Sequence, residues 1–338
     1  MSSAATQHDL EVNAGHRTRK SLRRGAVYAG LWVGILIMIV PFYWMIATSL
    51  KSPIEILEFP PTWIPTGHFA QTVDGAWEEV YVVSFNDVEC TTVVRPIDGG
   101  PERIYPSEQI VDRFRLRFSN YVDAWNQAPF ARYYFNTILV TLFVVAGVLV
   151  TSSLAAYAFA RMRFWGRDNI FVLFLSMMMV PQPVYIVPSY IVLVKLGWID
   201  TYQALIIPWL AHIFSIFLLR QHFKTIPNDL YDAAIIDSCS RFAFLWRVML
   251  PLSKAVLVAV VIFTIVGTWN SFLWPLVMTN TPEVRPLQVG LARFSQEQGT
   301  NHELMMAAAA FSIAPLIVAY FFAQKQIIQS LATSGMKS

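Results

Sequence analysis

Amide, hydroxyl and indole groups lie close together in one strongly apolar stretch of the sequence. Trp269 and Asn270 are adjacent, Thr268 and Ser271 flank them, and Trp274 follows three residues later. Amides and hydroxyls hydrogen-bond to ligand hydroxyl groups, and an aromatic face packs on the C–H face of a pyranose ring. An Asn in such a stretch usually faces protein or water. We predict that Trp269, Asn270 and Trp274 line a path for a sugar-like solute; the alternative for both Trp residues is an interfacial aromatic belt.

A second polar group lies between prolines. Gln182 is flanked by Pro181 and Pro183, and Tyr185 and Pro188 follow. Prolines free backbone carbonyls and permit bending, which suits a gate, although ordinary packing can use the same kink. We therefore add Gln182 and Tyr185 to the predicted solute path.

Groups that could catalyse a reaction do not form a suitable pattern. His212 lies in an apolar stretch without a nearby Asp or Glu, so we interpret it as a hydrogen-bonded His between helices rather than a proton relay. The sequence has no phosphate loop of the Gly-x-x-x-x-Gly-Lys-[Ser/Thr] form, and no paired His and carboxylates in apolar stretches. We predict no catalytic residue, no metal ligand and no cofactor bound by this chain.

Composition indicates which elements must position these groups. The chain has 338 residues, of which 55% are hydrophobic and 14% charged, whereas an average soluble domain is about 25% charged. A disordered or ordinary cytosolic protein is therefore excluded. The net charge of +3 is too small, and the basic residues too scattered, for nucleic-acid binding. Most of the chain must lie in a lipid bilayer.

Six windows are long and apolar enough to cross a hydrocarbon core about 30 Å thick, which takes roughly 20 helical residues. Backbone groups in lipid must be satisfied within the segment, so each window is expected to be a helix. We predict an all-α polytopic membrane protein. The predicted transmembrane helices cover 26–50, 133–160, 169–194, 201–219, 255–280 and 304–324, and the last five form a core domain over 133–324.

The basic residues predict the orientation of these helices. The predicted inner segments hold 15 of the 25 Lys and Arg residues. Because loops on the cytoplasmic side carry an excess of Lys and Arg, both termini are predicted to be cytoplasmic. The cytoplasmic segments are then the basic tail 1–25, the loop 220–254 and the tail 325–338.

The segment 51–132 is predicted to lie outside the membrane and to hold an insert at about 67–115. Apolar residues alternate from Trp77 to Arg95, Pro96 to Pro101 has the composition of a turn, and a short strand is expected near 103–105. We therefore expect a small β-rich extracytoplasmic insert.

The predicted cytoplasmic loop 220–254 contains short helices. Asp229 and Asp232 fall in the first turn of one of them, where carboxylates interact favourably with the helix dipole. Ala233 and Ala234 follow, and such small residues leave room for another protein to approach closely. The alternative is an amphipathic connector lying on the membrane surface.

The run IPNDLYDAAIIDSCSRFAFLWRVMLPLSK resembles the EAA loop in permease subunits of binding-protein-dependent ABC importers. That pattern has Glu-Ala-Ala, an Asp-Gly three residues on, and a later Pro. The positions here are Asp232, Ala233, Ala234, Asp237, Ser238 and Pro251. Asp232 replaces the Glu, Ala255 a second Pro, and Ser238 the Gly. The Ser is the notable departure, because Gly adopts a sharp turn at low cost and Ser does not.

Four further segments are similar to the sugar-importer branch of this family, in particular its six-span maltose-permease-like subunit. They are SLAAYAFARMRFWGRDNIF, KLGWIDTYQALIIPWLAHIFSIFLLRQHF, TWNSFLWPLVMT and QKQIIQSLATSGMKS. The resemblance covers about 41–66 and 116–338, and the insert is not part of it.

This resemblance implies a type I ABC importer permease fold in the inner membrane of a bacterium or archaeon. The implied partners are a homologous permease subunit forming a heterodimer, two ABC ATPase subunits that hold ATP and Mg, and an extracytoplasmic sugar-binding protein. The implied coupling helix lies around Asp232 to Ser240 and docks on an ATPase. Arg293, Gln296 and Glu297, in the outer loop from Thr281 to Glu303, would contact the binding protein.

The function implied is uptake of a di- or oligosaccharide through a path of which this chain forms half. Permeases of this kind also carry glycerol phosphate, so that compound or another small polar solute is the alternative. A non-transporting membrane subunit and an intramembrane enzyme are two further alternatives; the enzyme would need catalytic groups inside the spans, which the sequence lacks.

Overall fold

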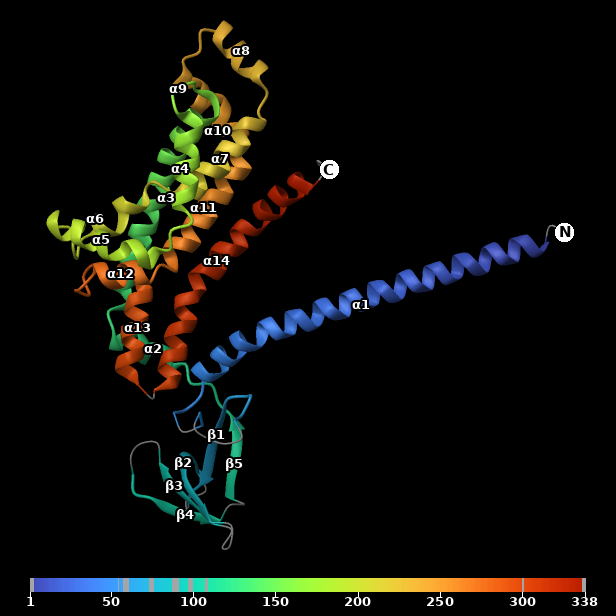
Figure 1. Ribbon diagram of the computed structural model, residues 1–338. Helices are drawn as coiled ribbons and strands as arrows, with labels where there is room; N and C mark the ends of the chain where they lie inside the picture. Colours follow the sequence, from blue (N-terminus) through green and yellow to red (C-terminus); the bar gives the residue numbers. More distant parts are fainter. Residues whose placement is uncertain are drawn as a thin grey trace. The chain divides into compact units, whose positions relative to one another are not determined.

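The computed structural model describes residues 3–53, 55–56, 61–72, 76–86, 91–96, 100–106, 109–299 and 301–335. The chain divides into two compact units. One comprises Met1–Val122 with Thr300–Ala310, and the other comprises Asp123–Gly299 with Phe311–Ser338. Figure 1 shows the helices and strands of both units, which are described separately here.

The first unit begins with one long helix, α1 (Ser3–Ser49). Its part Arg24–Ser49 is apolar enough to cross a membrane, and none of its most apolar window is buried inside the chain. The predicted first span is thus the second part of a longer helix, which ends at Ser49 rather than at residue 50. An apolar helix surface left uncovered by the chain suits contact with lipid or with another membrane protein.

The same unit contains a small antiparallel sheet, as predicted for the insert. Its five strands lie in the order β4-β3-β2-β1-β5. They are β1 (Thr66–Gln71), β2 (Trp77–Asn86), β3 (Thr91–Pro96), β4 (Arg103–Pro106) and β5 (Ile110–Phe114). Ala70, Val80 and Val94 form the buried core of the sheet. The core is this small because alternate residues of short strands face away from it.

The second unit is helical and is organised around α3 (Phe130–Arg161), which packs against α7 and α11. Its other elements follow α3 in chain order. They are α4 (Arg167–Met177), α5 (Gln182–Lys195), α6 (Tyr202–Ile206), η2 (Ile207–Trp209), α7 (Ile213–Thr225), α8 (Asn228–Ile236), α9 (Arg241–Phe244), η3 (Leu245–Met249), α10 (Leu250–Leu252), α11 (Lys254–Trp269), α12 (Leu273–Met278) and α13 (Leu287–Gln298). Residues of α2 (Ser119–Gln127) and α14 (His302–Gly335) belong to both units.

The structure has a helical membrane-type fold. Within the described residues, four helices are long and apolar enough to cross a membrane, and the number rises to six if each of two bent helix pairs is one span. One bent pair is α4 and α5, which cover most of the predicted span 169–194 at an angle of 101°. The bend lies beside Pro181, whose ring removes a backbone donor and interrupts the helix.

The predicted span 255–280 is also interrupted. Its first part is α11, which bends by 82° from the segment Arg241–Leu252. The helix ends at Trp269, and α12 begins at Leu273. The break therefore falls at Asn270 and Ser271, two residues of the polar group that the sequence places in this apolar stretch.

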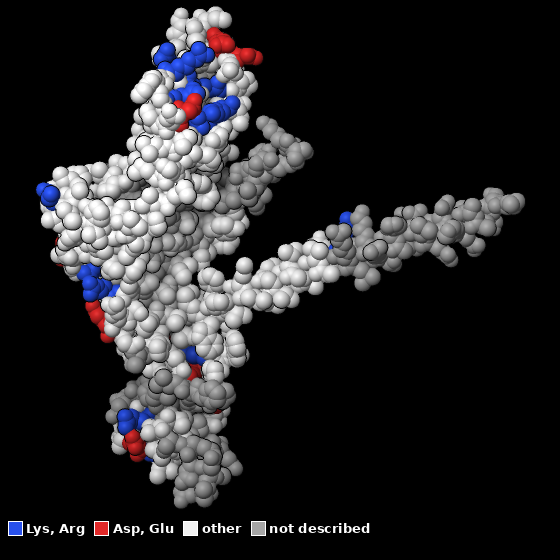
Figure 2. Space-filling view, in the orientation of Figure 1, with Lys and Arg blue, Asp and Glu red and all other residues white. Residues whose placement is uncertain are grey.

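Charged side chains form two groups on the face of the second unit that Figure 2 displays. Lys and Arg gather around α9 and α10, with acidic residues over α8, and a second group lies along the left edge of the view. The broad surface between the two groups is uncharged. An uncharged surface between charged groups is the pattern expected of a bilayer-spanning helix bundle.

Candidate functional site

A cavity of about 350 Å³ lies among the helices of the second unit. Its walls come from α3, α5, η2, α11 and α12, with His212 at the start of α7. Most of its surface is apolar. The polar side chains in the lining include Thr137, Gln182, His212, Thr268, Asn270 and Ser271. A mainly apolar cavity with a few convergent polar groups is the usual form of a small-molecule site.

Several of the polar groups are free to bind a solute. The side chains of Gln182, Thr268 and Ser271 form no hydrogen bond with described residues. Asn270 Nδ2 donates 2.9 Å to the carbonyl of Val266, which leaves its amide oxygen available. Amide and hydroxyl groups with unused hydrogen-bonding capacity can pair with the hydroxyl groups of a sugar.

None of the residues lining the cavity is Lys, Arg, Asp or Glu. His212, the one titratable imidazole there, is engaged through Nδ1 with Ser215 Oγ at 2.7 Å. A charged solute that entered would lose water without gaining an opposite charge from this chain, which is costly in an apolar setting. The cavity wall therefore favours an uncharged polar solute.

Three of the five residues predicted for the solute path line this cavity, namely Gln182, Asn270 and Trp274. The indole N–H of Trp274 donates 2.9 Å to the carbonyl of Ala204, so the ring is held in place. Trp209 stands edge-on to it with ring centres 5.4 Å apart and also lines the cavity. Trp209 was not predicted, because only the fold brings η2 next to α12.

The other two predicted path residues do not line the cavity. Trp269 is buried, with its ring edge-on to Tyr134 at 6.2 Å. Tyr185 is 36% exposed and lies outside the lining. Successive residues of a helix point about 100° apart, so the side chains of Trp269 and Asn270 leave the helix in different directions.

The EAA-like residues lie on and after α8, a helix with no buried residue. Asp232, Ala233 and Asp237 are exposed, and Ala234 is half-buried. Ile236 is 83% exposed, although an Ile of this size normally avoids water. An exposed helix that combines small, acidic and apolar side chains is a plausible surface for another protein. Pro251 lies apart from it, in α10, next to the 82° bend.

Ser238 forms the turn that ends α8. Its φ is +57°, a left-handed conformation that Gly adopts easily and that costs other residues roughly 1 kcal/mol. The backbone N–H of Cys239 donates 2.8 Å to the carbonyl of Ala234, which closes the turn. Ser240 Oγ then accepts a bond from Ala243 N at 3.2 Å and caps α9. Despite the missing Gly, the chain keeps the sharp turn.

Arg293, Gln296 and Glu297 lie on α13 and are all exposed. Their spacing of three and four residues places them along one side of the helix. The buried residues of α13, Leu287, Val289, Gly290 and Phe294, hold it against the unit. The segment predicted as an outer loop is therefore largely a helix that presents these three polar side chains together.

The connection 279–286, which leads into α13, is held by side chains from distant parts of the unit. Asn136 Nδ2 donates to the carbonyls of Glu283 at 3.0 Å and Arg285 at 2.9 Å. Asp200 Oδ1 accepts bonds from the backbone N–H groups of Asn280 and Thr281 at 2.9 and 3.1 Å. Burial alone would raise the pKa of Asp200, but these bonds outweigh it and lower the pKa below its usual value.

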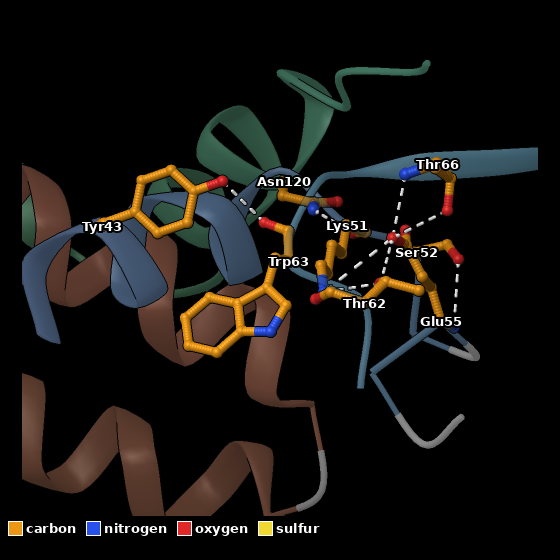
Figure 3. A network of polar contacts seen from close by, with 8 residues as sticks. All are labelled: Tyr43, Lys51, Ser52, Glu55, Thr62, Trp63, Thr66 and Asn120. Carbon is orange, nitrogen blue, oxygen red and sulfur yellow. Dashed lines mark hydrogen bonds and ion pairs between the residues drawn. The ribbon is translucent and has the colours of Figure 1, made fainter. Parts of the chain in front are cut away.

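A further polar cluster, in the first unit, was not identified from the sequence (Figure 3). Lys51 and Glu55 are each 2% exposed, and their charged atoms lie 3.9 Å apart. Glu55 Oε1 also accepts bonds from Thr62 Oγ1 at 3.0 Å and from Thr66 N at 2.9 Å. Asn120 Nδ2 donates to the carbonyl of Lys51 at 2.8 Å.

This cluster connects the end of α1 with the start of β1 and with α2. A buried charge must be paired and hydrogen-bonded to be tolerated, so the contacts define one arrangement of these chain segments. A Lys and a Glu four residues apart after an apolar helix are the only signal in the sequence, and such pairs are usually exposed.

Comparison with known proteins places these features in a family. Residues 147–333 match the model of the inner membrane component of binding-protein-dependent transport systems. The arabinooligosaccharides transport system permease protein AraQ of Bacillus subtilis (strain 168) is 34% identical over 228 residues, which are 67% of this chain and 81% of the relative.

Two other similar proteins extend over more of the chain. The sn-glycerol-3-phosphate transport system permease protein UgpE of Rhizobium meliloti (strain 1021) is 29% identical over 303 residues, which are 89% of this chain and 93% of the relative. A crystal structure of a bacterial ABC transporter involved in the import of the acidic polysaccharide alginate matches 90% of this chain and 96% of its own chain, with a TM-score of 0.66 and 22% identity. This last likeness supports the fold.

Proposed function

Because the chain belongs to the family of inner membrane components of binding-protein-dependent transport systems, we propose that it is the permease subunit of an ATP-driven ABC importer for a neutral di- or oligosaccharide. The observation that carries the proposal is the composition of the cavity wall. Gln182, Asn270 and Trp274 line the cavity together with the hydroxyl groups of Thr268 and Ser271, and no Lys, Arg, Asp or Glu belongs to the lining. An aromatic ring with amides and hydroxyls suits a pyranose or furanose ring bearing hydroxyl groups.

The cavity favours a neutral sugar over glycerol phosphate. One relative is named for arabinooligosaccharides and another for sn-glycerol-3-phosphate, which is an anion. A phosphate is normally bound by Arg, Lys or helix N-termini. The described lining of the cavity offers no Lys or Arg, so it supplies no cation that would compensate a phosphate.

The proposed topology has six spans with both termini in the cytoplasm. The bent pair α4 and α5 counts as one span, and α11, which belongs to the second bent pair, supplies another. The sheet formed by residues 66–114 then lies on the outer side, and α8 on the inner side. The excess of Lys and Arg in the predicted inner segments supports this orientation.

The proposed partners follow from two exposed helices. A cytoplasmic ATPase docks on α8 through Asp232, Ala233, Ala234 and Asp237, where Ile236 supplies exposed apolar surface. An extracytoplasmic sugar-binding protein contacts Arg293, Gln296 and Glu297 on α13. A homologous permease subunit supplies the other half of the path, and ATP with Mg is bound by the two ATPase subunits, whereas this chain hydrolyses nothing.

Reconstitution tests the solute. The chain, co-expressed with its partner subunits and binding protein, is placed in proteoliposomes, and ATP-dependent uptake of a labelled neutral arabino-oligosaccharide is compared with that of glycerol 3-phosphate. We expect uptake of the neutral sugar, and we expect Asn270→Leu or Gln182→Leu to reduce it. Val266→Ala, on α11 outside the cavity, is the matched control. Preferential uptake of glycerol 3-phosphate would refute the neutral-sugar assignment.

Affinity purification tests the two docking helices with one pair of charge reversals. Asp237→Lys is expected to lose the ATPase subunits while keeping the binding-protein interaction. Glu297→Lys, also an exposed acid on a helix surface, is expected to keep the ATPase and weaken the binding protein. If Asp237→Lys left both ATPase attachment and uptake intact, the assignment of α8 would be wrong.

A further inference from the structure

One arginine connects three elements at the end of the second unit where α8 begins. Arg161 is the last residue of α3, and its guanidinium donates to the carbonyl of Phe223 at 2.9 Å. It also donates to the carbonyl of Ile226, which follows α7, and to Oδ1 of Asn228, the first residue of α8. A single side chain therefore fastens the end of α3 to the end of α7 and to the start of α8.

A second arginine makes the reciprocal connection. Arg220 of α7 is 7% exposed, and its Nε donates 3.3 Å to the carbonyl of Phe159 in α3. Its Nη2 lies 3.1 Å from Asp168 at the start of α4, and its guanidinium lies over the ring of Phe171, 3.7 Å from the ring centre. We call Arg161 and Arg220 the arginine clasp. The clasp ties α3, α4 and α7 together, so their ends form one rigid assembly.

The helix α8 has no buried residue, but two of its side chains, Tyr231 and Ala234, are partly buried against the hydrophobic core of the unit. The ring of Tyr231 lies edge-on to Phe244 at 5.2 Å. Figure 1 shows α8 standing beyond the ends of its neighbours. Arg161 adds to this packing a side-chain hydrogen bond to Asn228, a directional contact through which a displacement of α8 reaches the end of α3.

The helix α3 extends from the clasp to the cavity without a break. It contains 32 residues, hence is about 48 Å long at 1.5 Å per residue. Thr137, Val140, Val144 and Val148 of the same helix line the cavity. Because a packed helix moves as a stiff rod, a shift of its end at Arg161 also shifts these side chains.

We propose that Arg161 and Arg220 are positioning residues that transmit the movement of α8 to the cavity-lining helix α3. The inference rests on the proposed function, because an ATPase docked on α8 is the source of the movement. The planar guanidinium is essential: it donates to several carbonyls at fixed angles, whereas Lys offers a flexible point charge. Replacement by Lys keeps the charge and removes the transmission.

The test measures how accessible the cavity wall is to a thiol reagent. In the complete transporter, with Cys90 and Cys239 replaced by Ser, Gly267→Cys places a thiol in the cavity wall, where an added Cβ meets no atom within 4 Å. The rate of maleimide labelling is measured without nucleotide and after trapping with ATP and vanadate. With Arg161 present, we expect the labelling rate without nucleotide to differ from the rate after trapping. With Arg161→Lys, we expect this difference to vanish and sugar uptake per ATP hydrolysed to fall about tenfold, a common size for coupling between sites.

The control is Arg163→Lys, an exposed arginine two residues further on that forms no side-chain hydrogen bond with described residues. It is expected to keep the nucleotide-dependent labelling. If Arg161→Lys does not assemble, Asn228→Ala, at an exposed position, removes one of the three acceptors and is expected to reduce the labelling difference partially.

The outcomes separate the two proposals. If Arg161→Lys retains the bound ATPase and also the full labelling difference, or if Asn228→Ala has no effect, the clasp does not transmit movement. Equal loss in Arg163→Lys, which breaks none of the hydrogen bonds of the clasp, would show that the effect does not depend on those bonds, and would also overturn the proposal. If the ATPase does not bind α8 in the unmodified transporter, the proposed function fails and the role of the clasp fails with it.

Discussion

Two connections in the second unit differ in how firmly they are attached. The connection 279–286 is bound by Asn136 and Asp200, and the helix that follows it is buried along one side. The connection that contains α8 has no buried residue in its helix. The difference indicates that the first belongs to the folded unit, whereas the second is an exposed surface, on which we propose that an ATPase docks. Substitutions should therefore affect stability in the first and partner binding in the second.

The largest effect on stability is expected from Asn136→Leu. The substitution removes the Asn136 donor from the carbonyls of Glu283 and Arg285 and the acceptor for Tyr202 Oη, which lies 2.6 Å away. The carbonyl of Glu283 keeps its bond from Arg132 Nε at 2.8 Å. Loss of three partly buried hydrogen bonds should lower the free energy of unfolding by about 2 kcal/mol or more. Thermal denaturation in detergent measures it. Asp232→Asn on α8 is the control, and equal losses in both variants would contradict the comparison.

A smaller loss is expected from Gly290→Ala in α13. The added Cβ would meet ring carbons of the buried Tyr133 at 2.2 to 2.8 Å, so the ring or the helix must shift. Overpacking of this kind costs about 1 to 3 kcal/mol. The control is Gly267→Ala, where nothing lies within 4 Å of the new atom. Melting temperatures that fall equally in the two variants would show that α13 is loosely packed.

Acid should loosen the connection 279–286 through Asp200. Its lowered pKa means that the carboxylate contributes stability above its unfolded pKa of about 4, and that this contribution is lost as the pH falls through the folded pKa. Asp200→Asn tolerates the local φ of +60° but has no titrating group. We expect a shallower acid dependence of the melting temperature in the variant, with a difference of about 1 kcal/mol at neutral pH. If the melting temperature fell with decreasing pH in the same way in both proteins, Asp200 would be excluded as a stabilising carboxylate.

The smallest effect, with the opposite sign, is expected from Ser238→Gly at the end of α8. Gly relieves the cost of the left-handed φ but gains freedom in the unfolded chain, so the net local stabilisation should stay below about 1 kcal/mol. Protease cleavage between α8 and α9 should slow, while the melting temperature of the whole protein hardly changes. A large rise in that temperature would mean that this turn belongs to the folded unit after all.

The fold was largely predictable where the signal is local. Apolar windows indicated the long helices, and alternation indicated β2 and β3. The short strand β4 was also expected, whereas β1 and β5 were not. Bending at the prolines around Gln182 was expected, but the full breaks at 178–181 and 270–272 were not, because proline and polar residues are tolerated in many continuous membrane helices. The buried pair of Lys51 and Glu55 was missed because its partners, Thr62 and Thr66, lie in a stretch without periodicity.

The residues that line the cavity were also only partly predictable from the sequence. Asn270 and Gln182 stand out as amides within apolar sequence and do line it. Trp269 stands out equally but packs on Tyr134, since the rotation of a helix about its axis decides which of two neighbours faces inward. Nothing in the sequence around Thr137 or Trp209 indicates a role in the cavity. Both residues line it only because the helices pack together in this way.

By itself, the sequence determined that most of the chain lies in a lipid bilayer and that its apolar stretches carry almost no charge, and it showed that the residues from Asp232 to Pro251 resemble an EAA loop. These properties depend on composition and on residues near one another in the chain. Only the tertiary structure decided that Arg161 reaches Phe223 and Asn228, more than sixty residues away, and which polar groups share a cavity. The physical reason is that a side chain meets a distant partner only when the packing and rotation of both helices place it there.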